Sequence, residues 1–214
     1  MHKKLVAAFL LLFFTTQQYS FADNPMQEAL SAYLKKDFAT AERIYLSIEE
    51  KDTVGGVAYN LGLLYERELK DLAKAIKFYT ISSNKGFMLA QNNLATLYRN
   101  GNGVKKDVEK AINLYYEAAS KGDEIAIKNL LQLAQENYFS AQQFTAYFYA
   151  VGPKKEIKRA YMWWNIAANN TKNESYLKQL NDLIQRAQTE MTEKQLEEAN
   201  TLISSCISSR LKKC

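Results

Sequence analysis

The fold is decided by the stretch of chain from Ala90 to Gly122, which reads AQNNLATLYRNGNGVKKDVEKAINLYYEAASKG. Its apolar residues recur at spacings of three and four, as Leu94 and Tyr98 do, and this spacing is typical of amphipathic helices. Two glycines around residue 102 favour a turn in the middle of the stretch. Asp107 follows where the N-cap of a second helix would stand. The stretch therefore predicts a helical hairpin.

The same hairpin recurs along the chain. The motif Leu94-Ala95-x-x-Tyr98 repeats Leu61-Gly62-x-x-Tyr65, which lies 33 residues earlier. Its small second residue would let two helices approach closely. A single hairpin cannot cover its own apolar face, so repeated hairpins must stack in a row. We therefore predict an all-α fold, a right-handed α-solenoid of stacked antiparallel helix hairpins.

The composition agrees with this fold. Only 8 Gly and 2 Pro occur in 214 residues, and 47% of the residues are hydrophobic. So few turn-forming residues favour a helical protein over a β-protein or a disordered one. The predicted helices span residues 25–35, 38–50, 55–67, 71–83, 88–99, 107–120, 124–136, 139–151, 156–169, 174–188 and 192–208. Asp71, Asp107, Asp123 and the Thr192-x-x-Gln195 capping box provide start signals.

The first 22 residues have the pattern of an export signal. Lys3 and Lys4 precede an apolar run from Leu5 to Phe14, and small residues stand before a cleavage point after Ala22. The run is too short to span a bilayer, which takes about 20 residues. We therefore expect a cleaved signal peptide at residues 1–22 and a periplasmic or secreted protein. Membrane contact would then be peripheral at most.

The stretch 90–122 resembles the Sel-one-like repeat, a relative of the tetratricopeptide repeat with a longer Gly-containing turn. Residues 57–86 are similar to a second copy, 146–168 to another, and 29–50 to half of a tetratricopeptide repeat. We expect one solenoid domain over residues 23–214. Its predicted parts are repeats at about 26–50, 55–86, 88–122 and 139–169, a degenerate helix at 124–136 and C-terminal capping helices at 174–208.

Several kinds of chemistry are excluded by residues that the chain lacks. Its one histidine, His2, lies inside the predicted signal, so the mature chain would hold no Ser-His-Asp triad and no histidine metal ligand. No Gly-rich phosphate-binding loop occurs either. We therefore predict that the protein is not an enzyme and holds no metal and no cofactor. The formal net charge of only +5 gives no support for a nucleic-acid partner.

After these exclusions, the class of function that remains is the binding of a partner molecule. In the repeats that the chain resembles, the first helix of each pair lines the concave side of the solenoid. Mapping those positions onto this chain predicts a partner-binding groove formed by Tyr59, Glu66, Arg67, Asn92, Arg99 and Asn100. Such mixed polar and aromatic residues suit a peptide or protein partner of unknown identity. The leading hypothesis is an exported protein-interaction scaffold.

Two other functions are compatible with the sequence. One is a binder of cell-wall glycans or muropeptides, for which Trp163 and Trp164 could form a sugar platform, although their repeat positions favour the core. The other is a β-lactam or peptidoglycan hydrolase, because the resemblance extends to cysteine-rich members linked to that chemistry. Lysine pairs at predicted turns, such as Lys105-Lys106 and Lys154-Lys155, could line one basic edge of the solenoid.

Cys206 and Cys214 are predicted to form a disulfide, because an exported protein enters an oxidising compartment. On one continuous helix, residues eight apart would be about 12 Å apart, at 1.5 Å per residue. A disulfide needs Cα atoms within about 7 Å. The last helix should therefore end near Ser208 or Ser209, with the following residues turning back.

Overall fold

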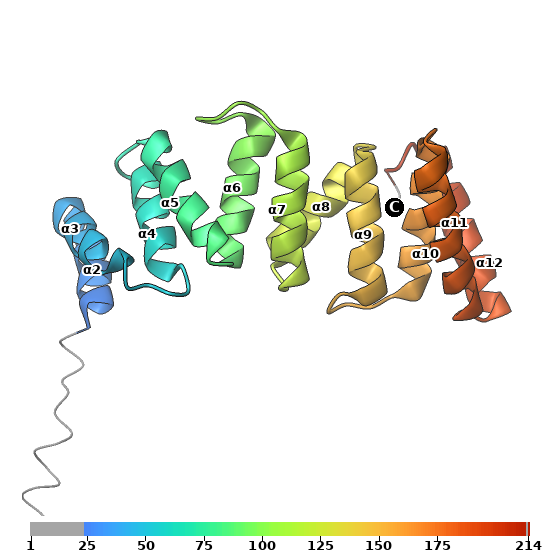
Figure 1. Ribbon diagram of the computed structural model, residues 1–214, viewed down its shortest axis with the longest axis horizontal. Coiled ribbons are helices and arrows are strands. Elements are labelled where there is room, and N and C mark those ends of the chain that lie inside the picture. The colour runs from blue at the N-terminus through green and yellow to red at the C-terminus, as the bar shows by residue number, and fades with distance from the viewer. Residues whose placement is uncertain (1–23, 213) are drawn as a thin grey trace, which may run out of the picture.

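The computed structural model describes residues 24–212 and 214, and these residues form helices without a strand. The helices stand side by side in one elongated row, from the N-terminal end to the C-terminal end (Figure 1). They are α2 (Pro25–Leu34), α3 (Phe38–Glu49), α4 (Gly56–Arg67), α5 (Leu72–Asn84), α6 (Met88–Asn100), α7 (Val108–Ser120), α8 (Glu124–Gln135), α9 (Phe139–Val151), α10 (Ile157–Asn170), α11 (Glu174–Thr189) and α12 (Glu193–Ser208). Every predicted helix is present, and no end differs by more than one residue. The expected signal peptide lies outside the described residues.

Local signals set these helix boundaries. Asp71, Asp107 and Asp123 accept hydrogen bonds from backbone N–H groups in the first turns of α5, α7 and α8, at 3.0, 2.9 and 2.8 Å. Each bond satisfies a donor that the helix itself leaves free. The predicted capping box joins Thr192 and Gln195 at the start of α12. The predicted start signals are confirmed.

The helices pair into the predicted antiparallel hairpins, α2 with α3, α4 with α5, α6 with α7 and α9 with α10. Close approach depends on small residues in the shared interface. A Cβ on Gly62 of α4 would overlap the ring of Tyr79 on α5. Ala95 has the same place in the next hairpin and is fully buried. The stacked hairpins form an all-α solenoid, as predicted.

The Gly-rich turn between α6 and α7 requires its glycines. Gly101 and Gly103 have φ angles of 75° and 72°, a left-handed conformation that other residues adopt at a cost. A Cβ on Gly103 would also come within 2.9 Å of Leu72. The turn therefore accounts for both glycines without a phosphate-binding role.

The apolar core runs along the row without a break. Its N-terminal and C-terminal parts both contact Tyr98 and Leu114, which join them in the middle. Trp163 and Trp164 are 0% and 4% exposed, so both are core residues, as their repeat positions predict. A sugar cannot stack on either indole ring in this fold.

One helix, α8, stands between two hairpins and packs against both α7 and α9. Adding a single helix instead of a pair changes the direction of the helices that follow. The turn between α6 and α7 therefore lies at one edge of the row and the turn between α9 and α10 at the other (Figure 1). Lys105-Lys106 and Lys154-Lys155 occupy these two turns. These two lysine pairs therefore lie at opposite edges and do not form one basic edge.

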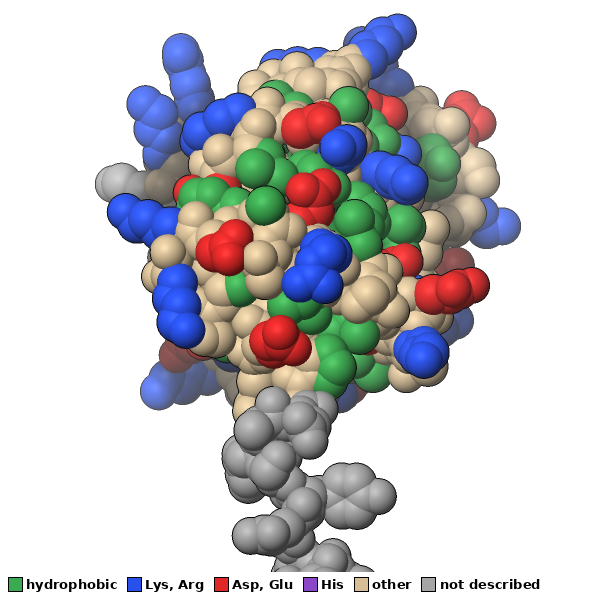
Figure 2. Space-filling model, turned by 90° about the vertical axis from the view of Figure 1, so that its left-hand side faces the viewer, with side chains coloured by type: hydrophobic (Ala, Val, Ile, Leu, Met, Phe, Trp, Pro, Cys, Tyr) green, Lys and Arg blue, Asp and Glu red, His purple; other side chains and the backbone are tan. Residues whose placement is uncertain are grey.

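The two ends of the solenoid differ. Leu30, Leu34 and Leu46 are 47%, 72% and 46% exposed at the end formed by α2 and α3. Hydrophobic side chains at this end alternate with charged ones (Figure 2). None of the described helices combines the length and apolar character needed to span a bilayer.

The chain turns back after α12, as the cysteine spacing requires. The helix ends at Ser208, and Arg210 and Leu211 follow with φ angles of 53° and 66°. The N–H of Leu211 donates to the carbonyl of Cys206 at 2.8 Å. This turn brings the Cα atoms of Cys206 and Cys214 to 5.0 Å, and their sulfur atoms form a disulfide.

Candidate partner-binding surface

Three helices, α4, α6 and α8, contribute neighbouring polar side chains to one surface. The predicted groove residues lie on α4 and α6. Side chains of α8 adjoin them, because Asn129 donates to Asn92 at 3.2 Å and Arg99 forms an ion pair with Glu136 at 2.7 Å. We name this surface the α4–α6–α8 face. It consists of Tyr59, Glu66, Arg67, Asn92, Arg99, Asn100, Asn129, Gln132 and Glu136.

Tyr59 is half-buried within this face. Its ring centroid lies 5.1 Å from that of Phe87 and 6.0 Å from that of Tyr79. Burial raises the pKa of the Tyr59 hydroxyl above its ordinary value. The two aromatic contacts hold the ring in place.

Glu66 is engaged by the fold. The hydroxyl of Tyr79 donates to the Glu66 carboxylate at 2.5 Å. Burial, and then this hydrogen bond, raise the pKa of Tyr79 well above its ordinary value. One oxygen of Glu66 thus joins α4 to α5, and the pairing limits how far the carboxylate can move toward a ligand.

Asn92 and Arg99 also have partners within the chain. Asn92 is 7% exposed, and its side-chain oxygen accepts the bond from Asn129. The side chain of Arg99 is 19% exposed and contacts Glu136 and Gln132. Sequence reasoning placed both residues in an open groove. In the folded chain, they position α8 against α6.

Arg67 and Asn100 are the predicted residues that remain accessible. Both are exposed at the C-terminal ends of their helices. Arg67 has no ion-pair partner among the described residues, in contrast to Arg99. A guanidinium without an ion-pair partner can bind carboxylate and carbonyl oxygens of a partner.

The residues that α8 supplies were missed by the sequence analysis. Asn129, Gln132 and Glu136 have no counterpart in the repeat pattern, so no register could assign them to a face. The one available signal was their spacing of three and four, which places polar residues on one side of a helix.

Three segments of the chain match the model of the Sel1 repeat, at residues 57–87, 89–123 and 139–171. The chain is a Sel1 repeat protein. The first two matches correspond to α4 with α5 and α6 with α7, and the third to α9 with α10. Helix α8 lies between the second and third repeats, so this Sel1 repeat protein has a single helix inserted into its array.

Solved structures of similar proteins were also found. One is c5321, described as a protective antigen present in uropathogenic Escherichia coli strains and displaying an SLR fold, with 21% identity over 86% of this chain and a TM-score of 0.46. Another is a Sel1 repeat protein from Oxalobacter formigenes, with 25% identity over 77% of this chain and 81% of the other, and a TM-score of 0.42. The chain spans about half of c5321, 52% of its length. No curated protein matches the sequence.

The residues that could support catalysis in this Sel1 repeat protein have structural contacts. Among the described residues, no cluster of three or more His, Cys, Asp or Glu side chains could hold a metal ion. Ser82 and Lys85 have the spacing of a Ser–Lys dyad, but the hydroxyl of Ser82 donates to the carbonyl of Gly55 at 2.6 Å. Lys85 forms an ion pair with Glu49 at 3.1 Å. These contacts give both residues structural roles.

Proposed function

We propose that this Sel1 repeat protein is an exported, non-enzymatic scaffold that binds a peptide or protein partner on the α4–α6–α8 face. Sel1 repeat proteins generally act as protein-interaction scaffolds. The observation that carries the proposal is the difference between Arg67 and Arg99. Arg99 is neutralised by Glu136, whereas Arg67 is exposed without an ion-pair partner among the described residues.

The rigidity of the surrounding residues supports binding at this position. Tyr59 is fixed by two aromatic contacts, and Glu66 by the hydroxyl of Tyr79. A surface whose side chains are already ordered loses little conformational entropy when a partner binds. Arg67 would supply the attraction for an acidic group of the partner, and Asn100 the hydrogen bonds to its backbone.

Export is the second part of the proposal. A disulfide such as Cys206–Cys214 persists in an oxidising compartment and is rare in the cytosol. The composition of residues 1–22 agrees with a signal peptide that precedes one solenoid domain over residues 23–214. Fractionation of cells that express the full chain tests this part. We expect the protein outside the cytoplasm, with a mass that lacks the first 22 residues.

The binding surface is tested by Arg67→Glu, which reverses an exposed charge that has no ion-pair partner among the described residues. We expect cross-linking of the native partner to fall at least tenfold, with helicity and melting temperature unchanged. Lys194→Glu, an exposed lysine on α12, is the matched control and should leave cross-linking unchanged. Arg99→Glu is unsuitable, because it would break the ion pair that holds α8. Equal cross-linking by Arg67→Glu and the unaltered protein would exclude this face.

A further inference from the structure

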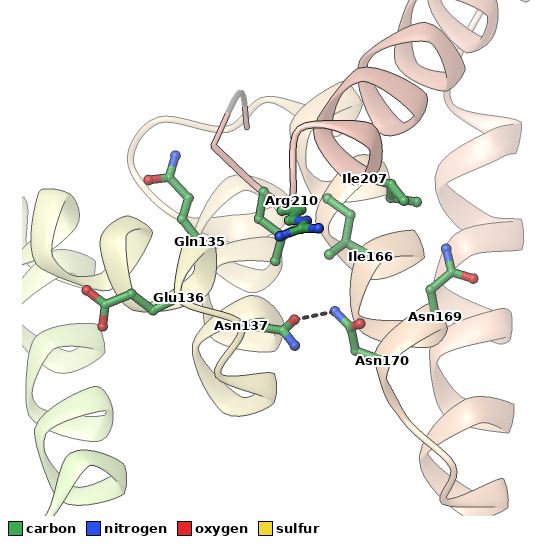
Figure 3. A pocket seen from close by; sticks show the side chains of 9 residues that line it. Gln135, Glu136, Asn137, Ile166, Asn169, Asn170, Ile207 and Arg210 are labelled. Atoms are coloured by element: carbon green, nitrogen blue, oxygen red, sulfur yellow. Dashed lines mark hydrogen bonds between the residues drawn. The ribbon is translucent and has the colours of Figure 1, made fainter.

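A pocket of about 690 Å³ lies at the edge of the row where α8 and α10 end (Figure 3). The chain that follows α12 covers part of it, so three segments far apart in the sequence enclose one space. A volume of this size is typical of sites for small molecules or a few residues of a peptide. The side chains that decide its chemistry are Asn137, Ile166, Asn170, Ile207, Arg210 and Leu211.

A network of amides orients Asn137 in the pocket wall. Its side-chain oxygen accepts one hydrogen bond from Gln142 at 3.0 Å and another from Asn170 at 2.8 Å. Gln142 is fully buried, and its own oxygen accepts a second bond from Asn170 at 3.0 Å. Among the described residues the amide nitrogen of Asn137 donates no hydrogen bond, so its two donors are available to a ligand.

The pocket carries one positive charge that the protein does not neutralise. Arg210 is exposed and has no ion-pair partner among the described residues. Glu136 also borders the pocket, but its carboxylate binds Arg99 at 2.7 Å and Gln132 at 2.8 Å. Its side chain extends away from Asn137 and Arg210 (Figure 3). The uncompensated guanidinium and the donors of Asn137 therefore favour an anionic oxygen ligand.

Apolar side chains form the rest of the wall. Ile166 and Leu211 are 1% and 8% exposed, and Ile207 is 46% exposed. An anion that is hydrated on all sides, such as sulfate, would not use this wall. A ligand with an aliphatic group beside its carboxylate would contact both parts of the pocket.

The end of α10 borders the same site, since Asn169 and Asn170 line the pocket. Thr171 follows the helix in an extended conformation, with φ −105° and ψ 141°. In the described chain, the backbone N–H of Thr171 donates no hydrogen bond to a carbonyl group of α10. The last carbonyl groups of α10 thus lack the capping bonds that Asn137 and Glu136 donate to the end of α8. A peptide has N–H groups that can bind these carbonyls, whereas a simple carboxylic acid has none.

We propose that this pocket binds the C-terminal end of a peptide whose last side chain is aliphatic. Arg210 and the amide of Asn137 hold the α-carboxylate, and the last side chain packs on Ile207, the exposed apolar residue of the lining. The site is separate from the α4–α6–α8 face, and the proposal does not depend on the function proposed for that face.

The disulfide is part of this site. Arg210 and Leu211 reach the pocket because the chain turns back through two left-handed residues, and the Cys206–Cys214 bond closes that turn. Removing the bond by Cys214→Ala leaves all six deciding residues in place but frees the segment that carries two of them. We expect weaker peptide binding from this variant.

The experiment uses N-acetyl-Ala-Ala-Leu with a free carboxylate and the same tripeptide with a C-terminal amide. Binding to residues 23–214 is followed by calorimetry and by the NMR signals of the side-chain amides. We expect the free acid to bind and to shift the Asn137 amide, with the amidated peptide at least tenfold weaker. 4-Methylpentanoate, which has the carboxylate and aliphatic group without peptide bonds, should also bind at least tenfold more weakly.

Two variants separate the proposal from effects on folding. Asn137→Asp keeps the acceptors for Gln142 and Asn170 but replaces the free donors by a negative charge. We expect this variant to fold normally and to lose binding of the free acid. Arg210→Gln should weaken binding at least tenfold, whereas Arg186→Gln, at an exposed arginine on α11, should have no effect.

The proposal is overturned by any of three results. These are no binding of the free acid at 5 mM (about 3 kcal/mol of binding free energy), equal binding of acid and amide, or unchanged binding by Asn137→Asp. If 4-methylpentanoate binds as tightly as the tripeptide, the pocket is a site for small carboxylic acids, and the assignment to a peptide is wrong.

Discussion

Tyrosine hydroxyls join neighbouring helices of the solenoid through carboxylates. Tyr79 on α5 donates to Glu66 on α4, Tyr65 on α4 donates to Glu42 on α3, and Tyr33 on α2 donates to Glu68, which follows α4. Burial raises the pKa of each of these hydroxyls, and the hydrogen bond to a carboxylate raises it further. The tyrosine rings fill the core, while the hydroxyls connect it to charged residues at the surface.

These pairs predict a loss of stability in alkali. In the unfolded chain a tyrosine loses its proton near its ordinary pKa of 10.0, whereas folded Tyr79 and Tyr65 keep theirs to higher pH. The folded state then binds more protons than the unfolded state, so the free energy of unfolding falls as the pH rises above about 10. Below pH 10 the contribution is fully present.

Tyr79→Phe tests this account. We expect the variant to lose about 1–3 kcal/mol at pH 7, because the half-buried Glu66 loses its donor. Its free energy of unfolding should also fall less steeply between pH 10 and 11. Urea denaturation at pH 7, 10 and 11 measures both effects. Tyr147→Phe is the control, since Tyr147 is 39% exposed. An equal slope for Tyr79→Phe and the unaltered protein would contradict the prediction.

At the scale of the element, the separation of paired helices is set by the size of one residue. Gly62 faces the ring of Tyr79, which is fully buried and cannot move aside without disturbing the core. Ala95 has the same position in the next hairpin, where α6 and α7 tolerate a methyl group. Matching positions in two repeats have thus adapted to different neighbours.

Gly62→Ala should therefore destabilise the protein by about 1–3 kcal/mol, because the cost of overpacking exceeds the gain in helix propensity. Gly56→Ala is the matched control at the first residue of α4, where a Cβ would have no neighbour within 4 Å. We expect the control to be neutral or stabilising by up to about 1 kcal/mol. Thermal and urea denaturation measure both variants. A stabilising Gly62→Ala would show that the interface has room.

At the scale of the whole molecule, the solenoid is held at its C-terminal end by a covalent bond. Cys206 is fully buried, and Leu211, inside the closed loop, is 8% exposed. Both belong to the core cluster formed by α6 to α12. The disulfide thus keeps the last turn of the chain against the apolar face that a terminal helix would otherwise expose.

Loss of this disulfide should cost about 2–3 kcal/mol, as expected for a short closed loop. Cys214→Ala tests the loss without placing a polar group in the core, because Cys206 stays in place as a thiol. We also expect protein prepared without reductant to be a monomer with a mass two hydrogens below that of the reduced form. Two titratable thiols, or a dimer that dissociates on reduction, would contradict the pairing within one chain.

Much of this architecture follows from the sequence alone. The eleven described helices, their Asp caps and the turn after Ser208 depend on residues close together in the chain. The spacing of apolar residues along a helix and the capping of its ends depend only on nearby residues, so a sequence pattern can predict both.

The position of α8 and the side-chain pairs that it forms follow only from the tertiary structure. This helix lies outside the matched repeats, and its packing pairs Arg99 with Glu136 and Asn92 with Asn129. It also moves the later turns to the opposite edge and leaves the pocket beside Asn137. These features depend on which helices become neighbours in space. Which helices become neighbours depends on the packing of segments that are distant in the sequence. The spacing of apolar residues within one helix does not predict this packing.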